Sequence, residues 1–226
     1  MNRETIKAFL SDPLSLGGTT ESQIDQWKMG LEEIVRPTLE ASGNPLGEGM
    51  SGNQGMIWSI AFSSDGNRLA SAGKDGTVWF WNPANGCRVD EVLHSNQGGI
   101  MSIAISPDGE RLASGGLDGT VQLWRTDKDA FLNEPQPGHS NAVLSIAFSP
   151  DGQHLVSAGK DGKVQRWDPV SGIAVGKPLS KSGNPVSSIA FSSNSKQFAF
   201  GVHDGSVQLW AATGKKPLHT LEGHTD

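Results

Sequence analysis

Four side chains in the middle of the chain could form one continuous line of hydrogen bonds. They are His139, Ser157, Asp161 and Trp167. A buried indole N–H needs an acceptor, a serine hydroxyl can accept that bond and donate its own proton to an imidazole, and a carboxylate can hold the other ring nitrogen. The same residue types form the Ser-His-Asp relay of hydrolases. We nevertheless expect a structural network, because the tryptophan would occupy the serine and the pattern provides neither oxyanion donors nor a pocket.

No other pattern predicts a metal or cofactor site. The remaining histidines lack metal-ligand spacing and a cysteine partner; they are His94, His154, His203, His219 and His224. Residues 47–52 fit the pattern GxGxxG, but a strand is expected after them instead of the helix that a dinucleotide site requires. We therefore expect no cofactor and no metal.

Charge and hydropathy narrow the class of partner. The formal net charge is −6, and no basic stripe of the kind that phosphate binding requires is present. No apolar run approaches the ~20 residues of a membrane-spanning helix, and the N-terminus lacks the pattern of a secretory signal. The single cysteine, Cys87, fits a reducing compartment. These features predict a cytoplasmic protein that binds neither nucleic acid nor membranes.

A 43-residue repeat organises the chain around the four side chains. The sequence Ser-Ile-Ala followed by Phe or Ile starts at residues 59, 102, 145 and 188, and a tryptophan and an Asp-Gly pair recur at the same interval. A period near 43 residues with four strand signals in each unit is typical of a propeller blade, whereas helical solenoids show 3.6-residue periodicity. The repeat predicts an all-β fold of four four-stranded blades.

The strands can be placed within each unit. In the first unit we expect them over 57–63, 68–73 and 77–81, joined by turns in which glycine supplies positive φ. The outer strands are expected in the connectors, at about 88–93, 131–136, 173–179 and 216–221. Residues 1–38 do not follow the repeat and are predicted to form a short helical extension, with its best helix over 24–34. That helix either covers a blade edge or acts as a tether or dimerisation helix.

The third unit carries the clearest signatures. It opens with Gly138-His139, contains Ser-Pro-Asp-Gly over 149–152 and closes with Trp167-Asp168. These residues resemble the WD-repeat β-propeller family, and the resemblance covers roughly residues 39–226. It implies repeats at about 53–95, 96–138, 139–181 and 182–223, with the start of a fifth at 223–226. The uniform period is also similar to that of bacterial proteins with long WD-repeat arrays.

The resemblance implies that the four side chains of the third unit form the family's structural tetrad. In the other units the matching residues are Ser71, Asp75 and Trp81, then Ser114, Asp118 and Trp124, then Asp204 and Trp210. Asn53 and Asn96 stand at the histidine position of the first two units, and an amide can also donate and accept hydrogen bonds. In the fourth unit Ser182 and Phe200 replace the histidine and the serine, so Trp210 is expected to lack its acceptor, at a cost of ~1–3 kcal/mol.

The resemblance also implies a partner-binding rim where each connector enters the inner strand and just before each tetrad aspartate. The candidates are Met56, Trp58, Lys74, Met101, Leu117, Leu144, Lys160 and His203, with Gly99, Ala142, Pro185 and Ser187 at the remaining equivalent positions. An exposed apolar cluster flanked by lysines is typical of a protein-binding surface. The alternative places Trp58 and Met101 between the blades, because strand alternation allows either side.

The function that these patterns favour is a non-enzymatic scaffold that binds a protein or peptide on one face of the propeller. The alternatives are a self-assembling part of a larger propeller or sensor array, and a propeller hydrolase. Four blades leave two open edges with unpaired backbone groups. We therefore expect a head-to-tail homodimer or a piece of a longer array, ahead of a self-closed ring of four blades.

Overall fold

The computed structural model describes residues 52–89, 92–95, 98–126, 132, 134–180 and 183–224. All of them belong to one compact unit. The described residues form sixteen strands and no helix. The predicted N-terminal helix lies outside the described residues.

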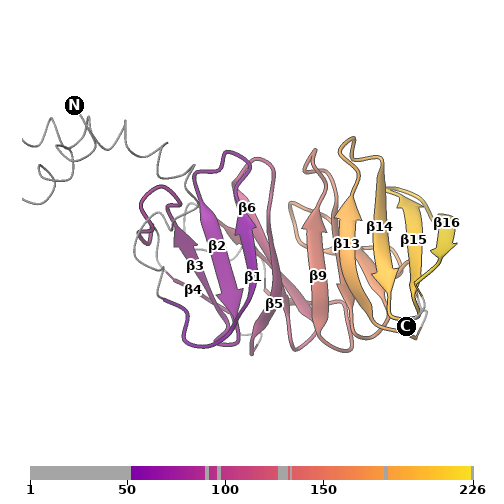
Figure 1. Ribbon diagram of the computed structural model, residues 1–226, viewed down its shortest axis with the longest axis horizontal. Helices are drawn as coiled ribbons and strands as arrows, with labels where there is room; N and C mark the ends of the chain where they lie inside the picture. The colour runs from indigo at the N-terminus through magenta and orange to yellow at the C-terminus, as the bar shows by residue number, and fades with distance from the viewer. Residues whose placement is uncertain are drawn as a thin grey trace, which may run out of the picture. The chain divides into compact units, whose positions relative to one another are not determined.

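Four antiparallel sheets of four strands each follow one another along the chain (Figure 1). Blade 1 contains β1 (Ile57–Phe62), β2 (Leu69–Gly73), β3 (Thr77–Trp81) and β4 (Leu93–His94). Blade 2 contains β5 (Ile100–Ile105), β6 (Arg111–Gly116), β7 (Thr120–Arg125) and β8 (Gln136–Pro137). Blade 3 contains β9 (Val143–Phe148), β10 (Leu155–Gly159), β11 (Val164–Trp167) and β12 (Ala174–Val175). Blade 4 contains β13 (Val186–Phe191), β14 (Gln197–Val202), β15 (Ser206–Ala211) and β16 (Pro217–Glu222). The prediction of an all-β chain with four four-stranded blades is confirmed.

A repeated turn joins the first two strands of each blade. In blade 3 the hydroxyl of Ser149 donates to Asp151 at 2.5 Å and accepts from the amide of His154 at 2.9 Å, and Gly152 follows with φ +71°. Blades 1 and 2 use glycine at the same place. Blade 4 uses Ser195, which is the one non-glycine residue with positive φ among the described residues. Its hydroxyl accepts a hydrogen bond from the amide of Asp151 at 3.0 Å and so links blade 4 to blade 3.

The outer strands of the first three blades are shorter than predicted. Each has two residues, whereas β16 has six. Gly176, with φ +71°, ends β12, and Pro178 beyond it has no N–H to donate. In blade 1 the expected strand is reduced to an isolated bridge at Arg88 and the pair Leu93–His94. The segment that forms β16 contains no glycine and has its proline at the first position, so it pairs from Pro217 to Glu222 with a single irregularity at Leu218.

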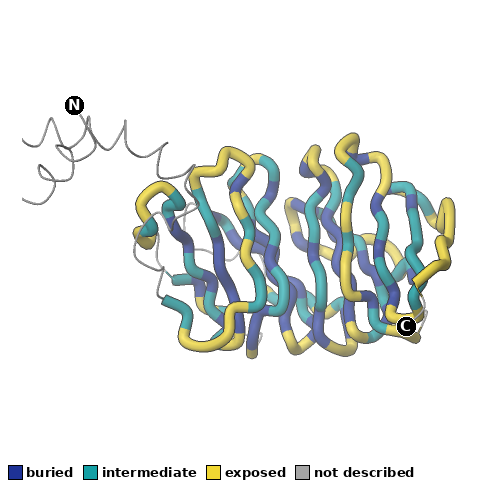
Figure 2. Tube along the Cα trace, in the orientation of Figure 1, coloured by how far each residue is buried: buried dark blue, intermediate teal, exposed yellow. Residues whose placement is uncertain are grey.

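Consecutive blades pack face to face. Inner strands β1, β5, β9 and β13 lie side by side in that order, and each junction between blades encloses an apolar core. Figure 2 shows the buried residues along these strands in dark blue. The core between blades 1 and 2, for example, joins Phe80 and Leu93 of blade 1 to Ile100 and Ile103 of blade 2. Four blades thus share three cores, and no comparable packing joins β13 to β1 within the described residues.

Candidate functional site

The third blade holds a complete hydrogen-bond network around its tryptophan. The indole N–H of Trp167 donates to Ser157 Oγ at 2.7 Å, and Ser157 Oγ lies 2.7 Å from His139 Nε2. His139 Nδ1 lies 3.0 Å from Asp161 Oδ1. Since the Ser157 oxygen already accepts from the indole, its own proton is directed at Nε2. His139 is therefore the neutral tautomer that carries its proton on Nδ1 and donates it to the carboxylate.

Burial and hydrogen bonds shift the pKa values of this pair. The pKa of His139 is lowered because burial penalises the imidazolium more than Asp161 favours it. Burial raises the pKa of Asp161, but hydrogen bonds from His139 and from the amides of Ser140 and Lys163 outweigh it and lower the pKa to about 2. The pair therefore consists of a neutral imidazole and a carboxylate at neutral pH.

The first blade builds an equivalent network without histidine. Trp81 donates to Ser71 at 2.8 Å, and the Ser71 hydroxyl donates to Asn53 Oδ1 at 2.7 Å. The Asn53 amide donates to Thr77 Oγ1 at 3.0 Å, and that hydroxyl donates to Asp75 at 2.9 Å. A threonine hydroxyl thus bonds both the asparagine amide and the aspartate. Sequence reasoning placed Asn53 correctly at the histidine position but did not anticipate the role of Thr77.

The other two tryptophans also have acceptors. Trp124 donates to Ser114 at 2.9 Å, and Asn96, expected to continue this network, lies outside the described residues, as does Ser182 of the fourth blade. Trp210 lacks the usual serine acceptor, as expected, but the expected cost of an unpaired indole does not arise. Its indole donates to Gln208 Oε1 at 3.2 Å, two residues earlier on the same strand, while Phe200 stacks against the ring at 6.3 Å between centroids.

The geometry of the third network bears on the catalytic alternative. Ser157 is fully buried, and both sides of its hydroxyl are occupied, by Trp167 and by His139. A nucleophilic serine must present its oxygen to a substrate carbonyl. In this arrangement Ser157 cannot do so, and the network instead joins the strands β10 and β11 to the loop that enters β9.

One backbone contact positions the rim candidates in every blade. The residue just before each tetrad aspartate donates its amide to the carbonyl of the residue that leads into the inner strand, at 2.9 Å each time. The four pairs are Lys74 with Met56, Leu117 with Gly99, Lys160 with Ala142, and His203 with Pro185. The two sets of rim positions predicted from the sequence are therefore brought together at one edge of each blade.

A β-bulge leaves one more residue unpaired beside this edge. In β1 the register steps from Ile57 opposite Gly73 to Ser59 opposite Ala72, which leaves Trp58 without a partner. The same step occurs in the other three inner strands and leaves Met101, Leu144 and Ser187 unpaired. A bulge re-aims the side chain of its extra residue and interrupts strict alternation. Sequence alternation alone could not decide where these side chains lie, because the bulge is a property of strand pairing.

The rim is most apolar where blades 1 and 2 meet. Met56 and Leu117 are 61% and 43% exposed, and Trp58 is half-buried and lies outside the three apolar cores. A methyl group added to Gly99 would lie 3.0 Å from both the Trp58 ring and Leu117 Cδ1. The tryptophan and the leucine thus converge over a glycine that leaves room for them.

The rest of the rim is more polar. Met101 and Leu144 are half-buried, whereas Lys74, Lys160 and His203 are exposed. Blade 4 contributes the exposed Ser187 in place of a large apolar residue. We name the eight predicted residues the bulge rim, namely Met56, Trp58, Lys74, Met101, Leu117, Leu144, Lys160 and His203. Its apolar part is concentrated on blades 1 to 3 and is flanked by two lysines.

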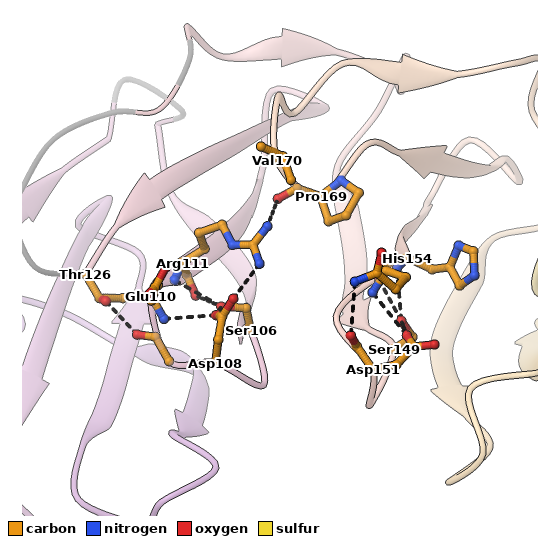
Figure 3. Close-up of polar contacts among 12 residues, drawn as sticks. Ser106, Asp108, Glu110, Arg111, Thr126, Ser149, Asp151, His154, Pro169 and Val170 are labelled. Atoms are coloured by element: carbon orange, nitrogen blue, oxygen red, sulfur yellow. Dashed lines mark hydrogen bonds and ion pairs between the residues drawn. The ribbon is translucent and has the colours of Figure 1, made fainter.

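Polar contacts join the blades at the opposite ends of the inner strands. Arg111 bridges blades 2 and 3, since its guanidinium donates to the Pro169 carbonyl at 2.8 Å while it also pairs with Asp108 at 2.6 Å (Figure 3). Arg68 makes the equivalent bond to Thr126 at 3.0 Å between blades 1 and 2. These arginines act as clamps between neighbouring turns.

The third blade lacks this clamp because His154 occupies the arginine position. Arg166, from the neighbouring strand, donates to the Ala212 carbonyl at 3.1 Å instead, and a cavity of about 340 Å³ opens beside it between blades 3 and 4. Asp168, which lines the cavity, accepts bonds from the amides of Val170 and Ser171 and so caps its own turn. Arg166, which also lines the cavity, has a buried Nε without a hydrogen-bond partner among the described residues.

Neither a metal centre nor a membrane span is found in the described part of the chain. No group of three or more His, Cys, Asp or Glu side chains there is arranged to hold a metal ion. The same residues include no helix long and apolar enough to cross a membrane.

Comparison with protein families identifies the repeat. The model for the WD domain, G-beta repeat (WD40), matches residues 43–82, 88–125, 132–168 and 176–211, which together span more than half of the chain. The chain belongs to the WD40 repeat family. Each match ends one residue after the tryptophan of a third strand, which agrees with the register of the four blades. WD40 repeats generally serve as scaffolds for protein–protein interaction and are typically non-enzymatic. A comparison with curated proteins gave no match.

Proposed function

We propose that this WD40 chain is a non-enzymatic scaffold whose bulge rim binds a protein or peptide segment. The observation that carries the proposal is the bulge repeated at Trp58, Met101, Leu144 and Ser187, which aims one side chain per blade at the same edge. Hot spots of protein interfaces are enriched in large residues set among contacts that exclude water. Trp58, backed by Gly99 and Leu117, meets that description.

The rim chemistry defines the ligand class. Met56 and Leu117 offer exposed apolar surface, and Lys74 and Lys160 stand exposed on either side of it. A matching ligand carries at least one large apolar side chain for the position beside Trp58 and an acidic residue within reach of a lysine. The ligand expected from these features is an extended segment of an acidic, apolar-containing protein.

Selection from a phage-displayed library of random linear peptides tests this proposal. We expect the wild-type chain to enrich peptides that combine an aromatic or aliphatic residue with Asp or Glu. The double variant Met56→Ser/Leu117→Ser should bind the enriched peptides at least about tenfold more weakly, since it removes the exposed apolar anchors. Lys74→Glu/Lys160→Glu should weaken the same peptides and make binding less dependent on salt.

The matched control is Val170→Ser/Ile173→Ser. Both of these residues are exposed and apolar, at 68% and 60%, but they lie in the turn before β12 and not on the rim. The control should leave peptide binding unchanged. Equal losses in the control and in the rim variants, or enriched peptides that bind all variants equally, would contradict a site on the bulge rim.

A further inference from the structure

Blade 1 exposes apolar residues whose equivalents in the other blades pack against the preceding blade. Ile57 and Ile60 are 51% and 62% exposed, whereas their equivalents Ile100 and Ile103 are 0% and 5% exposed. Phe62 is exposed as well, at 60%. In blades 2 to 4 the equivalent residues pack against the preceding blade. We define the leading face as Ile57, Ile60 and Phe62.

Blade 4 carries the complementary face. Leu221 is 56% exposed, whereas its equivalent in blade 1, Leu93, is 2% exposed and packs against blade 2. Val207 is half-buried, whereas the equivalent valines of blades 1 to 3 are buried. Space is also open above Gly201, where an added Cβ would meet nothing within 4 Å. We define the trailing face as Ser188, Gly201, Val207 and Leu221.

A repeated hydrogen bond shows how the two faces match. The serine that begins each Ser-Ile-Ala motif accepts a bond from the amide of the isoleucine in the next blade: Ser59 from Ile103 at 3.1 Å, Ser102 from Ile146 at 3.2 Å and Ser145 from Ile189 at 3.2 Å. The Ser188 hydroxyl and the Ile60 amide are the two equivalent groups that remain. Within the described residues neither takes part in a bond of this serine-to-amide ladder. The missing fourth bond would join Ser188 to Ile60.

The apolar groups match in the same way. At the junction of blades 2 and 3, an added Cβ on Gly115 would lie 2.5 Å from Val143 Cγ1, so the valine occupies the space beside the glycine. Gly201 and Ile57 are the equivalents of this glycine and this valine in the two free faces. Leu221 would meet Ile57 and Ile60 as Leu93 meets Ile100 and Ile103.

We propose that the trailing face of one copy of this chain binds the leading face of a second copy, so that two copies join head to tail at two identical junctions. The junction continues an interface that the chain already forms three times. Terminal units of a repeat protein that remain solvent-exposed need polar outer surfaces, and here the leading face keeps Ile57, Ile60 and Phe62. Two copies make a ring of eight blades, within the usual range of propellers, whereas three copies exceed it.

This proposal does not depend on ligand binding at the bulge rim, because the two surfaces share no residue. Sedimentation equilibrium of the full chain provides the first measurement. We expect a dimer that dissociates only on dilution, with no larger species. Ile60→Glu should raise the dissociation constant at least about 100-fold, because it places a charge in an apolar interface. Because Ile60 is exposed in the single copy, the unfolded fraction of the Ile60→Glu variant in dilute solution should equal that of the wild type. Val170→Glu, an equally exposed apolar site outside both faces, is the matched control and should remain dimeric.

Mixing two variants tests the head-to-tail arrangement. Ile60→Glu blocks only the leading face, and Gly201→Trp blocks only the trailing face, so each alone should be monomeric. Mixed, they retain one intact junction and should form a one-to-one heterodimer that cannot close. A face-to-face dimer through two leading faces would give no such complementation.

The outcomes separate clearly. A concentration-independent monomer would overturn the proposal and would indicate that residues of the same copy cover the leading face. Masses that grow beyond the dimer would overturn closure with two copies. An intact dimer in rim variants that have lost peptide binding would leave this inference standing. A wild-type chain that binds peptides but stays monomeric would overturn it without affecting the proposed function.

Discussion

The networks of blades 1 and 3 show that histidine is not required to anchor the blade tryptophan. Asn53 with Thr77 and His139 with Asp161 have the same effect: each pair holds a serine hydroxyl in place to accept a hydrogen bond from the indole N–H. The two networks differ at the residue that follows the Asp-Gly turn, which is Thr77 in blade 1 and Lys163 in blade 3. The choice of histidine or asparagine is thus coupled to a second position two residues beyond the aspartate.

This coupling predicts the result of a transplant. His139→Asn alone should destabilise the chain by about 1–2 kcal/mol, because Lys163 offers no hydroxyl to accept from the amide as Thr77 does in blade 1, so a buried donor would lack a partner. Adding Lys163→Thr should restore most of that loss by rebuilding the network of blade 1. Urea unfolding monitored by circular dichroism measures both values. A double variant no more stable than the single one would contradict the proposed role of the threonine hydroxyl.

The same residue predicts a pH dependence. The folded-state pKa of His139 is below its ordinary value of 6.5, so the unfolded chain takes up the proton more readily. Stability from this group is fully present above about pH 6.5 and is lost as the pH falls toward the folded-state pKa. The wild type should therefore lose stability between pH 7.5 and 5 relative to His139→Asn/Lys163→Thr, which lacks the buried imidazole. A difference between the two proteins that does not vary with pH would exclude this origin.

The aspartates of the Asp-Gly turns should contribute different amounts to the free energy of unfolding. Asp161 is 5% exposed in its side chain and binds His139 and two backbone amides, whereas Asp204 is exposed and bonds mainly to Ser206. Asp161→Ala should cost about 2 kcal/mol, because it leaves buried donors unpaired, and Asp204→Ala should cost less. Thermal melts of the two variants make the comparison, and equal losses would argue against a special role of the complete network.

Ser195 combines backbone strain with a contact between blades. Its φ of 59° is unfavourable for a residue with a side chain, and its hydroxyl accepts the amide of Asp151. Ser195→Ala keeps the strain and loses the bond, so it should destabilise by about 1 kcal/mol. Ser195→Gly loses the same bond but relieves the strain, so it should be the more stable of the two. Chemical denaturation of both variants decides the order.

At the scale of single strands, junction glycines report how tightly neighbouring blades pack. Gly115 faces Val143 across the junction of blades 2 and 3, and Gly201 faces open space at the same position of blade 4. Gly115→Ala should destabilise by about 1–3 kcal/mol through overpacking. In dilute solution, where the chain is a monomer, Gly201→Ala should be neutral or stabilise by up to about 1 kcal/mol, because alanine restricts the unfolded strand more than glycine does. The free energies of unfolding of the two variants, measured side by side, test this contrast.

The inner three strands of each blade could be predicted because their signals are local. Alternation, Asp-Gly turns and the period placed β1, β2 and β3 to within one residue. The bounds of the outer strands could not be predicted, because their length depends on how many residues of the connector pair with the third strand of the blade. The bulge at Trp58 and the Gln208 acceptor of Trp210 were missed for a similar reason, since both arise from pairing and side-chain reach within the folded sheet.

At the scale of the whole molecule, the dimer proposal predicts that stability depends on concentration. A partner that binds only the folded chain stabilises it by mass action. The Tm should rise by about 2–4 °C for each tenfold increase in chain concentration. Ile60→Glu should abolish this dependence and leave the Tm at the dilute value. A wild-type Tm that stays constant with concentration would contradict association in the folded state.

The serine-to-amide ladder also bears on how such a chain can evolve. Every bond of the ladder joins residues 44 positions apart, and each blade carries both the accepting serine and the donating isoleucine. Unequal recombination within the gene that inserts or deletes a whole 43-residue unit therefore leaves all other junctions unchanged and creates one with the same partners. An exchange out of phase would move the serine away from its amide. The number of blades can thus change in whole steps without a new interface having to arise.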